Sequence, residues 1–342
     1  MGTLASGTRQ VGEAKAAAGP NRQASIADAV TDLGELCRLL DLPPPTPPAC
    51  RAAEGFSLLV PRPYLGRIRR GDPRDPLLLQ VLPREEELHV APPFTTDPVG
   101  EHQAEGSCGL LRKYANRALM VTTAACGVHC RFCFRRHFPY RDGPGRAGAW
   151  DRALEEIAAD ESIREVILSG GDPLTLDDRT LADLAGRLAE IPRLRRLRIH
   201  TRVPIVLPDR VTVGLLDCLR GTRLSPVVVV HANHPGEIDR QVAASLGRMV
   251  DGGIPVLAQT VLLKGVNDRL EVLAELLERL VDLRVMPYYV HQLDRVAGAA
   301  HFEVPEAAGR RLIEDLRARL PGYAVPRYVR EVAGESSKRL LA

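Results

Sequence analysis

The sequence predicts an α/β protein with a parallel sheet, either a partial, open barrel or a doubly wound sheet. After residue 111, short apolar runs rich in β-branched residues alternate with helical patterns. This alternation is typical of βαβ units. About six such units fit into the chain, fewer than the eight that close a TIM barrel. In both architectures ligands bind at the carboxyl ends of the strands.

The elements are predicted from this alternation. The expected strands are Ala118–Thr122, Glu165–Ser169, Leu194–His200, Val227–His231, Val256–Leu262 and Val285–Val290. The expected helices between them are Trp150–Ala159, Leu176–Glu190, Ile238–Asp251 and Leu270–Val281. We therefore expect a barrel region over residues 111–300, followed by a C-terminal segment over residues 301–342.

Two segments of different composition precede the barrel region. Residues 1–25 are rich in Ala, Gly and Gln, and a flexible tail is expected there. From Ile26 to about Leu42 the apolar spacing is helical, and a proline-rich stretch that reads as an extended linker follows. Residues 51–110 mix short helical patterns with many prolines. We expect residues 26–110 to form an accessory region on the barrel.

The overall composition is that of a soluble globular protein. The 342 residues are 45% hydrophobic and 26% charged, with a formal net charge of +3. No apolar run approaches the ~18 residues of a membrane helix, and no secretory signal is evident at the start of the sequence. The low net charge and the 4% aromatic content argue against nucleic-acid binding. A cytoplasmic location is expected.

Lysine is rare in this chain. Among 46 basic residues the lysines are Lys15, Lys113, Lys264 and Lys338. Lysine can lose its proton and form an imine with a carbonyl group, which arginine cannot do. Although a solvated surface charge is the ordinary role of a lysine, each of these four is a candidate for covalent chemistry.

Three of the seven cysteines follow the first predicted strand directly, as Cys126, Cys130 and Cys133. A tetrahedral zinc site would need a fourth ligand, which His129 or His137 could supply, but the chain has no second C-x-x-C pair. A thioredoxin-type redox pair would leave the third cysteine unused. A four-iron cluster explains the count, because three thiolates leave one iron open to another ligand.

The C-x-x-x-C-x-x-C spacing, with Phe132 before the last cysteine, resembles the signature of radical S-adenosylmethionine enzymes. The chain also resembles one branch of these enzymes, the lysine 2,3-aminomutase family, over about residues 26–338. The segments that carry this resemblance are Cys133-Phe-Arg-Arg-His-Phe, His200-Thr-Arg-Val-Pro-Ile-Val, His231-Ala-Asn-His-Pro, Gln259-Thr-Val-Leu-Leu-Lys-Gly-Val-Asn-Asp and Met286-Pro-Tyr-Tyr. The resemblance implies a partial, open (β/α)6 barrel with a C-terminal segment that carries pyridoxal phosphate.

The resemblance implies three cofactors: a [4Fe-4S] cluster, S-adenosylmethionine and pyridoxal 5′-phosphate. It assigns the cluster to Cys126, Cys130 and Cys133. It assigns S-adenosylmethionine to Ser169, Gly170, Gly171, Asp172, His231 and Gln259. It assigns pyridoxal phosphate to Lys338 as the covalent attachment point, with Lys113, Tyr114 and Arg117 near the phosphate.

The resemblance also implies how the substrate is held. Arg135 matches the arginine that binds the substrate carboxylate, a role that suits the planar guanidinium fork. Asp294 matches one of two acids that bind the distal ammonium of lysine. The second family acid is an aspartate, whereas this chain has Glu331 there. This departure leads us to expect slow turnover.

The implied activity is conversion of (S)-α-lysine to (R)-β-lysine, with an external electron donor. The closest likeness is to the branch that serves elongation factor P and its lysyl ligase, and a homo-oligomer is a further expectation. An aminomutase for another amino acid, or one that makes β-lysine for another use, stays open. A radical enzyme that modifies a protein would need the cluster but not Lys338. A non-catalytic zinc module would need only the cysteines.

Overall fold

A computed structural model describes residues 26–101, 109–140 and 150–342 and contains one nine-stranded sheet. The tail predicted over residues 1–25 lies outside the described residues. The strands are β1 (Leu110–Leu111), β2 (Arg117–Thr123), β3 (Glu165–Gly170), β4 (Arg196–Thr201), β5 (Ser225–His231), β6 (Val256–Leu262), β7 (Met286–Gln292), β8 (Arg327–Arg330) and β9 (Arg339–Leu340). Each strand pairs with its neighbours in the chain, so the order in the sheet follows the sequence.

The strands from β2 to β8 are all parallel, and the short β1 and β9 pair antiparallel at the two edges. Within the described residues β1 and β9 do not pair with each other, so the barrel is open. The six predicted strands are present within about two residues of their expected bounds. The C-terminal segment adds β8 to the same sheet as a further parallel strand beside β7.

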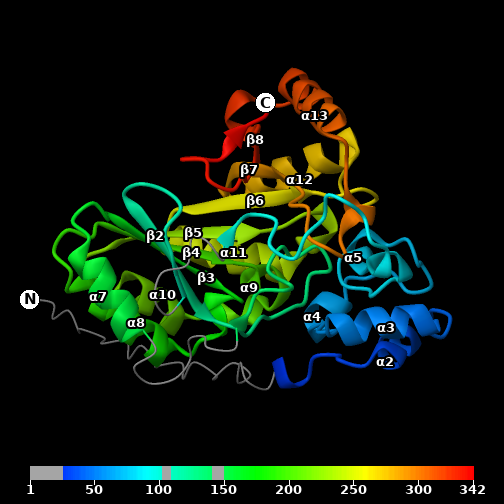
Figure 1. Cartoon of the computed structure of the whole chain (residues 1–342), viewed down its shortest axis with the longest axis horizontal. Helices are drawn as coiled ribbons and strands as arrows, with labels where there is room; N and C mark the ends of the chain where they lie inside the picture. Colours follow the sequence, from blue (N-terminus) through cyan, green and yellow to red (C-terminus); the bar gives the residue numbers. More distant parts are fainter. Residues whose placement is uncertain (1–25, 102–108, 141–149) are drawn as a thin grey trace, which may run out of the picture.

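Amphipathic helices cover the outside of the sheet (Figure 1). They are α7 (Asp151–Ala159), α8 (Asp178–Ala189), α10 (Val213–Arg220), α11 (Arg240–Asp251), α12 (Leu270–Asp282) and α13 (Glu306–Arg319). The single turn α9 (Val203–Val206) is apolar and buried throughout. In α8 the side chain of Asp177 caps the first turn, and Leu181, Leu184 and Leu188 are buried at helical spacing. The sequence predicted α7, α8, α11 and α12 but neither α10 nor α13.

The accessory region consists of short helices, grouped in Figure 1 on the side of the molecule away from α7 and α8. They are α2 (Leu33–Leu39), α3 (Pro47–Gly55), α4 (Arg62–Leu65), α5 (Pro76–Leu79) and the 3-10 helix η1 (Glu85–Leu88). The long helix predicted from Ile26 to about Leu42 is wrong: Val30 bridges to Val60, and α2 begins only after its cap, Asp32. The proline-rich stretch is extended only as far as Thr46, which caps α3.

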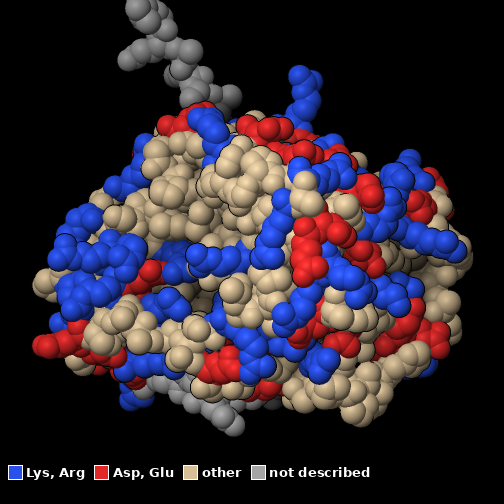
Figure 2. Space-filling model, turned by 90° about the horizontal axis from the view of Figure 1, so that it is seen from above, with Lys and Arg blue, Asp and Glu red and all other residues tan. Residues whose placement is uncertain are grey.

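The accessory helices and the barrel share one hydrophobic core, in which Leu36 and Leu78 belong to the same buried cluster as Leu168 and Val230. Basic and acidic side chains are interspersed over the face seen in Figure 2. Among the helices of the described residues, none combines the length and the apolar character that crossing a membrane requires.

Candidate active site

A cavity of about 850 Å³ lies at the carboxyl ends of the parallel strands. Its volume is within the range of ~300–1,000 Å³ that is usual for small-molecule sites. Every residue assigned above to a metal, a cofactor or the substrate lines this cavity: Lys113, Tyr114, Arg117, Cys126, Cys130, Cys133, Arg135, Ser169, Gly170, Gly171, Asp172, His231, Gln259, Asp294, Glu331 and Lys338. The fold therefore brings together residues that lie far apart in the sequence.

The loop that carries the three cysteines leaves the end of β2 and is bound to the end of β3 by backbone contacts. The amide of Gly171 donates to the carbonyl of Thr123 at 2.7 Å. A Cβ atom on Gly171 would lie 2.2 Å from the Ala125 carbonyl oxygen, and Gly170 has a φ of +116°. Close backbone approach is therefore the reason for both glycines, and the approaching backbone is the protein's own.

The three cysteine thiols of this loop line one wall of the cavity. Burial raises the pKa of each thiol, to about 11 for Cys133. Neighbouring thiols of the set raise the pKa of Cys126 and Cys133 further, whereas the Arg202 guanidinium opposes the rise at Cys130. Across the described ranges, no group of three or more His, Cys, Asp or Glu side chains already has the arrangement of a metal site. The donor set of three thiols on one loop nevertheless suits an iron–sulfur cluster, because metal binding displaces the thiol protons.

Asp172 connects two strand ends. Its carboxylate accepts hydrogen bonds from the hydroxyl of Thr201 at 2.7 Å and from the amides of Leu174, Arg202 and Val203 at 3.0, 2.6 and 3.0 Å. These contacts fix the end of β3 against the end of β4 and the start of α9. Because its carboxylate accepts from four donors of the protein itself, Asp172 fixes the shape of the cavity in addition to lining it.

Arg135 is buried and already has a carboxylate partner. Its Nε and Nη2 atoms donate to Glu101 at 2.7 and 2.6 Å, and Nη1 donates to the Ser169 hydroxyl at 2.9 Å. Although burial disfavours the charge, Glu101 keeps the pKa of Arg135 above its ordinary value. Glu101 was not among the predicted site residues, and no sequence pattern links it to Arg135.

A second group of charges surrounds Lys338. The carboxylate of Glu331 accepts from the Lys338 ammonium and from the Tyr114 hydroxyl, and Lys113 Nζ lies 3.8 Å from it. Burial alone would raise the pKa of Glu331, but Lys338 and the other donors hold it below its ordinary value. The Arg117 guanidinium lies 4.6 Å from the centre of the Tyr114 ring.

Lys338 is held in place by the pairing of the two strands between which it lies in the chain, β8 and β9. It directly precedes β9, which pairs antiparallel with β8, and Tyr328 exchanges backbone hydrogen bonds with Leu341 and Ala342. Gly334, with a φ of +79°, lies in the turn between the two strands. The strand β8 and the turn at Gly334 return the lysine to the cavity.

Asp294 follows β7 and faces both groups of charges. Burial is the main cause that raises the pKa of its carboxyl group, to about 7, and the charges of Glu331 and Glu101 act in the same direction. Lys338 and Lys113 oppose this rise. The cavity thus contains an acid that changes its charge near neutral pH and whose ionised form a further positive charge would favour.

Two partly buried histidines of the cavity, His200 and His291, were not among the predicted site residues, whereas His231 was. The side chain of His231 contacts Asn233 Oδ1 at 3.0 Å, and burial lowers its pKa to about 3. His200 and His291 also line the cavity, and burial lowers the pKa of both well below the ordinary value. Their position at strand ends is the signal that could have found them.

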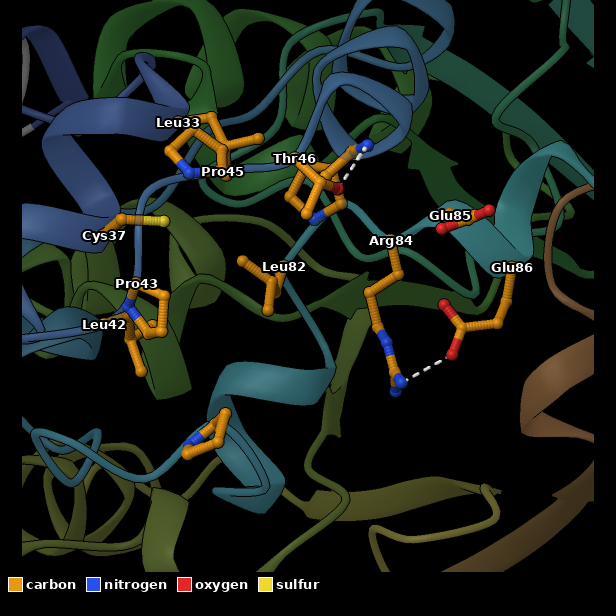
Figure 3. Close-up of a pocket in the computed structure, with 13 residues that line it drawn as sticks. Leu33, Cys37, Leu42, Pro43, Pro45, Thr46, Leu82, Arg84, Glu85 and Glu86 are labelled. Atoms are coloured by element: carbon orange, nitrogen blue, oxygen red, sulfur yellow. Dashed lines mark hydrogen bonds and ion pairs between the residues drawn. The ribbon is translucent and has the colours of Figure 1, made fainter.

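A second, smaller cavity of about 250 Å³ lies in the accessory region (Figure 3). It is mostly apolar, with Leu33, Leu42 and Leu82 in its lining, and no residue assigned above borders it. The Arg84 guanidinium at this cavity is already paired with Glu86 at 2.6 Å. The candidate chemistry is therefore confined to the larger cavity.

Comparison with known proteins identifies a superfamily and relatives in sequence. Residues 120–277 match the model of the radical SAM superfamily. The L-lysine 2,3-aminomutase of Escherichia coli is 45% identical over 315 residues, covering 92% of each chain. That of Haemophilus influenzae is 43% identical over 318 residues, covering 93% of this chain and 94% of that protein. A solved radical SAM methyltransferase from Sphaerobacter thermophilus aligns with a TM-score of 0.41 and 21% identity, over 64% of this chain and 68% of that one.

The sequence relatives decide the assignment, since their identity is high and extends over nearly the whole of both chains. They agree with the expectation from the cysteine spacing and from the ordered motifs that follow it. The chain belongs to the L-lysine 2,3-aminomutase family of isomerases, within the radical SAM superfamily.

Proposed function

We propose that this protein is an isomerase that moves the amino group of lysine from C2 to C3 and so produces β-lysine. The observation that carries the proposal is the single cavity in which Cys126, Cys130 and Cys133 face Lys338, Arg135 and Asp294. When bound, a [4Fe-4S] cluster with S-adenosylmethionine supplies a radical, and pyridoxal phosphate supplies a carbonyl group for the substrate amine. These cofactors suit the donor sets of the cavity.

Lys338 is the residue to which pyridoxal phosphate would be attached. An ammonium must lose a proton before its nitrogen can attack a carbonyl group. The carboxylate of Glu331 contacts Lys338 Nζ and would position this nitrogen in the cavity. Lys113, Tyr114 and Arg117 would then supply donors for the phosphate from the segment that leads into β2.

The two ends of the substrate would be held by opposite charges. Arg135 would bind the substrate carboxylate. The carboxylate would accept from the N–H groups that Glu101 and Ser169 leave free, or it would replace Glu101 as the partner of the guanidinium. Asp294, with Glu331 near it, would receive the distal ammonium. A glutamate substrate would bring a second negative charge to these acids and would be rejected.

S-adenosylmethionine would be bound by the six lining residues that the family resemblance assigns to it: Ser169, Gly170, Gly171, Asp172, His231 and Gln259. The two glycines let the cysteine loop pack closely against the end of β3, which shapes this part of the cavity. An external donor would supply the electron.

We further propose that the product is (R)-β-lysine for elongation factor P and that the protein acts in the cytoplasm beside the lysyl ligase, as a homo-oligomer. Sequence resemblance supports this use. It is tested by incubating the enzyme, the ligase and elongation factor P with isotopically labelled lysine. Mass spectrometry should find the label on elongation factor P only when the aminomutase is active. Modification at the same level without it would contradict this use.

The activity itself is tested by anaerobic turnover of lysine with S-adenosylmethionine, pyridoxal phosphate and a reductant. The expected product is β-lysine, and an iron-loaded protein that forms none would contradict the proposal. Borohydride reduction followed by peptide mapping should place the pyridoxyl label on Lys338. The matched variants are Lys338→Arg, which should lose the label, and Lys264→Arg, which should keep it.

A further inference from the structure

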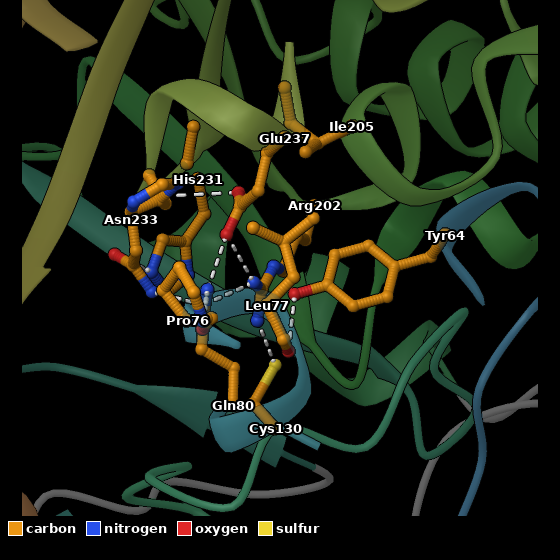
Figure 4. Close-up of polar contacts among 12 residues, drawn as sticks. Tyr64, Pro76, Leu77, Gln80, Cys130, Arg202, Ile205, His231, Asn233 and Glu237 are labelled. Carbon is orange, nitrogen blue, oxygen red and sulfur yellow. Dashed lines mark hydrogen bonds and ion pairs between the residues drawn. The ribbon is translucent and has the colours of Figure 1, made fainter. Parts of the chain in front are cut away.

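A buried polar network surrounds one of the three cysteines (Figure 4). Arg202 follows β4 directly, and its amide is fixed by Asp172 Oδ2 at 2.6 Å. Its side chain is only 5% exposed. Nη1 of this guanidinium donates to Cys130 Sγ at 2.7 Å. A full positive charge is therefore held against a candidate cluster sulfur.

The same guanidinium is positioned from two other segments. Its Nη2 atom donates to Gln80 Oε1 at 2.6 Å and to Glu237 Oε1 at 3.1 Å. Gln80 ends α5 in the accessory region, and Glu237 belongs to a short 3-10 helix after β5. Gln80 Nε2 also donates to Glu237 Oε1 at 2.7 Å, so the acid and the amide fix each other.

Glu237 supplies the opposing charge. Its side chain is fully buried, and its second oxygen accepts from the amide of Asn233 at 3.2 Å. The Nδ2 atom of Asn233 donates to Gln80 Oε1 at 2.9 Å, which completes the network. The negative charge thus lies behind Arg202 as seen from Cys130, and solvent does not screen either charge strongly.

The network leaves one buried donor of Arg202 without a hydrogen-bond partner. Within the described part of the chain, the buried Nε atom of Arg202 has no hydrogen-bond partner. A buried donor without a partner costs stability. Phe132 lies beside the guanidinium, 5.5 Å from its carbon to the ring centre, and offers no acceptor oxygen. Arg202 is therefore oriented so that Nη1 contacts Cys130, although the network offers Nε no acceptor.

We propose that Arg202 is a positioning residue that raises the reduction potential of the cluster through its charged hydrogen bond to Cys130, and that Glu237 limits this rise. The inference rests on the proposed assignment of Cys126, Cys130 and Cys133 to the cluster. Reduction adds one negative charge to a cluster, so a nearby positive charge favours the reduced state and a nearby negative charge opposes it. Hydrogen bonds to cluster sulfurs and charges that contact the ligands act in this way.

The test measures the cluster potential of reconstituted full-length protein by anaerobic redox titration, followed by electron paramagnetic resonance. Arg202→Gln should lower the one-electron reduction equilibrium constant at least tenfold, which is about 59 mV. Glu237→Gln should raise it by a similar factor. Arg210 is an equally buried arginine that binds Asp178 at 2.6 Å and touches no cluster cysteine. Arg210→Gln should therefore stay within twofold of the wild type.

The opposite direction of the two shifts distinguishes an electrostatic effect from a loss of structure, which would move both variants alike. With full iron content, shifts in the same direction or shifts below twofold would overturn the inference. If Arg202→Gln does not retain iron, Glu237→Gln decides alone: a higher potential supports the inference and an unchanged or lower one contradicts it. A wild-type protein that binds no iron would contradict the proposed function instead.

Discussion

Asp294 is a carboxyl group whose charge depends on what fills the cavity. Its pKa is raised to about 7, chiefly by burial and also by the charges of Glu331 and Glu101. In the unfolded chain the same group has a pKa near 3.8. Between these values the folded protein binds a proton that the unfolded chain has lost. Stability contributed at this position therefore falls as the pH rises from about 4 to about 7.

Replacing Asp294 by asparagine should remove this loss. Without cofactors or lysine, Asp294→Asn should melt about 2 °C or more above the wild type at pH 8, roughly the shift that ~1 kcal/mol gives in a large domain. The difference should shrink toward pH 4, where the folded carboxyl is protonated and the unfolded one is about half protonated. Thermal melts across this range measure it, and a gap that does not change with pH would contradict the raised pKa.

The same substitution should harm lysine turnover. If Asp294 binds the distal ammonium, Asp294→Asn should lower kcat/KM for lysine at least tenfold, about 1.4 kcal/mol. Steady-state assays on the cofactor-loaded enzyme measure this ratio. Glu278→Gln, on the outer helix α12, is the control and should leave it unchanged. Turnover within threefold of the wild type would exclude Asp294 as the substrate anchor.

Much of the cavity could be predicted at this scale, but its internal pairing could not. The cysteine spacing indicated Cys126, Cys130 and Cys133, because few residue types perform that chemistry. The rarity of lysine left four candidates, from which the family resemblance selected Lys338. Glu101 was missed because its partner, Arg135, lies on another element and the pairing leaves no pattern in the sequence. Long-range ion pairs depend on the folded geometry.

At the scale of elements, the contact between the end of β3 and the cysteine loop should tolerate no side chain at Gly171. Gly171→Ala would place a Cβ atom 2.2 Å from the Ala125 carbonyl oxygen, which forces the backbone to move. We expect a loss of about 3 kcal/mol, at the upper end for overpacking, and reduced iron retention. Urea unfolding and iron analysis measure the two effects.

Gly247 provides the matched control inside α11, where an added Cβ meets nothing within 4 Å. Gly247→Ala should stabilise the protein by about 0.5–1 kcal/mol, because alanine suits a helix better than glycine. It should leave iron binding unchanged. Equal effects of the two substitutions would show that the strand-end contact has no special importance.

The elements that the sequence predicted well are those with a strong periodic signal. The β-branched core of β5 and the regular apolar spacing of α12 (Leu270–Asp282) have one clear interpretation. In contrast, α13 was missed because Glu306–Arg319 is dominated by Arg, Glu and Ala. The start of α2 was misjudged because a bridge between Val30 and Val60 replaces local helix formation. Tertiary contacts decide such boundaries.

At the scale of the whole molecule, the accessory region holds the cysteine loop by a buried cluster of charges. The carboxylate of Glu87 in η1 binds Arg131 at 2.8 and 2.6 Å and Arg136 at 2.7 Å, and its side chain is 1% exposed. The amide of Arg131 also donates to the Gln80 carbonyl at 2.9 Å. The accessory region is therefore part of the site.

Neutralising Glu87 should destabilise both the accessory region and the cysteine loop. Glu87→Gln leaves Arg131 and Arg136 buried without a counter-charge, which should cost about 3–5 kcal/mol of unfolding free energy. Glu275→Gln breaks an exposed pair with Arg279 instead and should cost under ~1 kcal/mol. Denaturant titration of both variants checks this. A loss at Glu87 no larger than that at Glu275 would contradict the role of the cluster.

The neighbour-to-neighbour order of the sheet has a consequence for the timing of assembly. Strand pairing can proceed along the chain, because each new strand closes only a short connection. The cysteine loop follows β2, whereas Lys338 follows β8 at the far edge of the parallel strands. The thiols are therefore present long before the last parallel strand brings the lysine opposite them. During that interval the cavity lacks the side that β8 and β9 complete. Its cysteines are then exposed to metal ions and oxidants in solution.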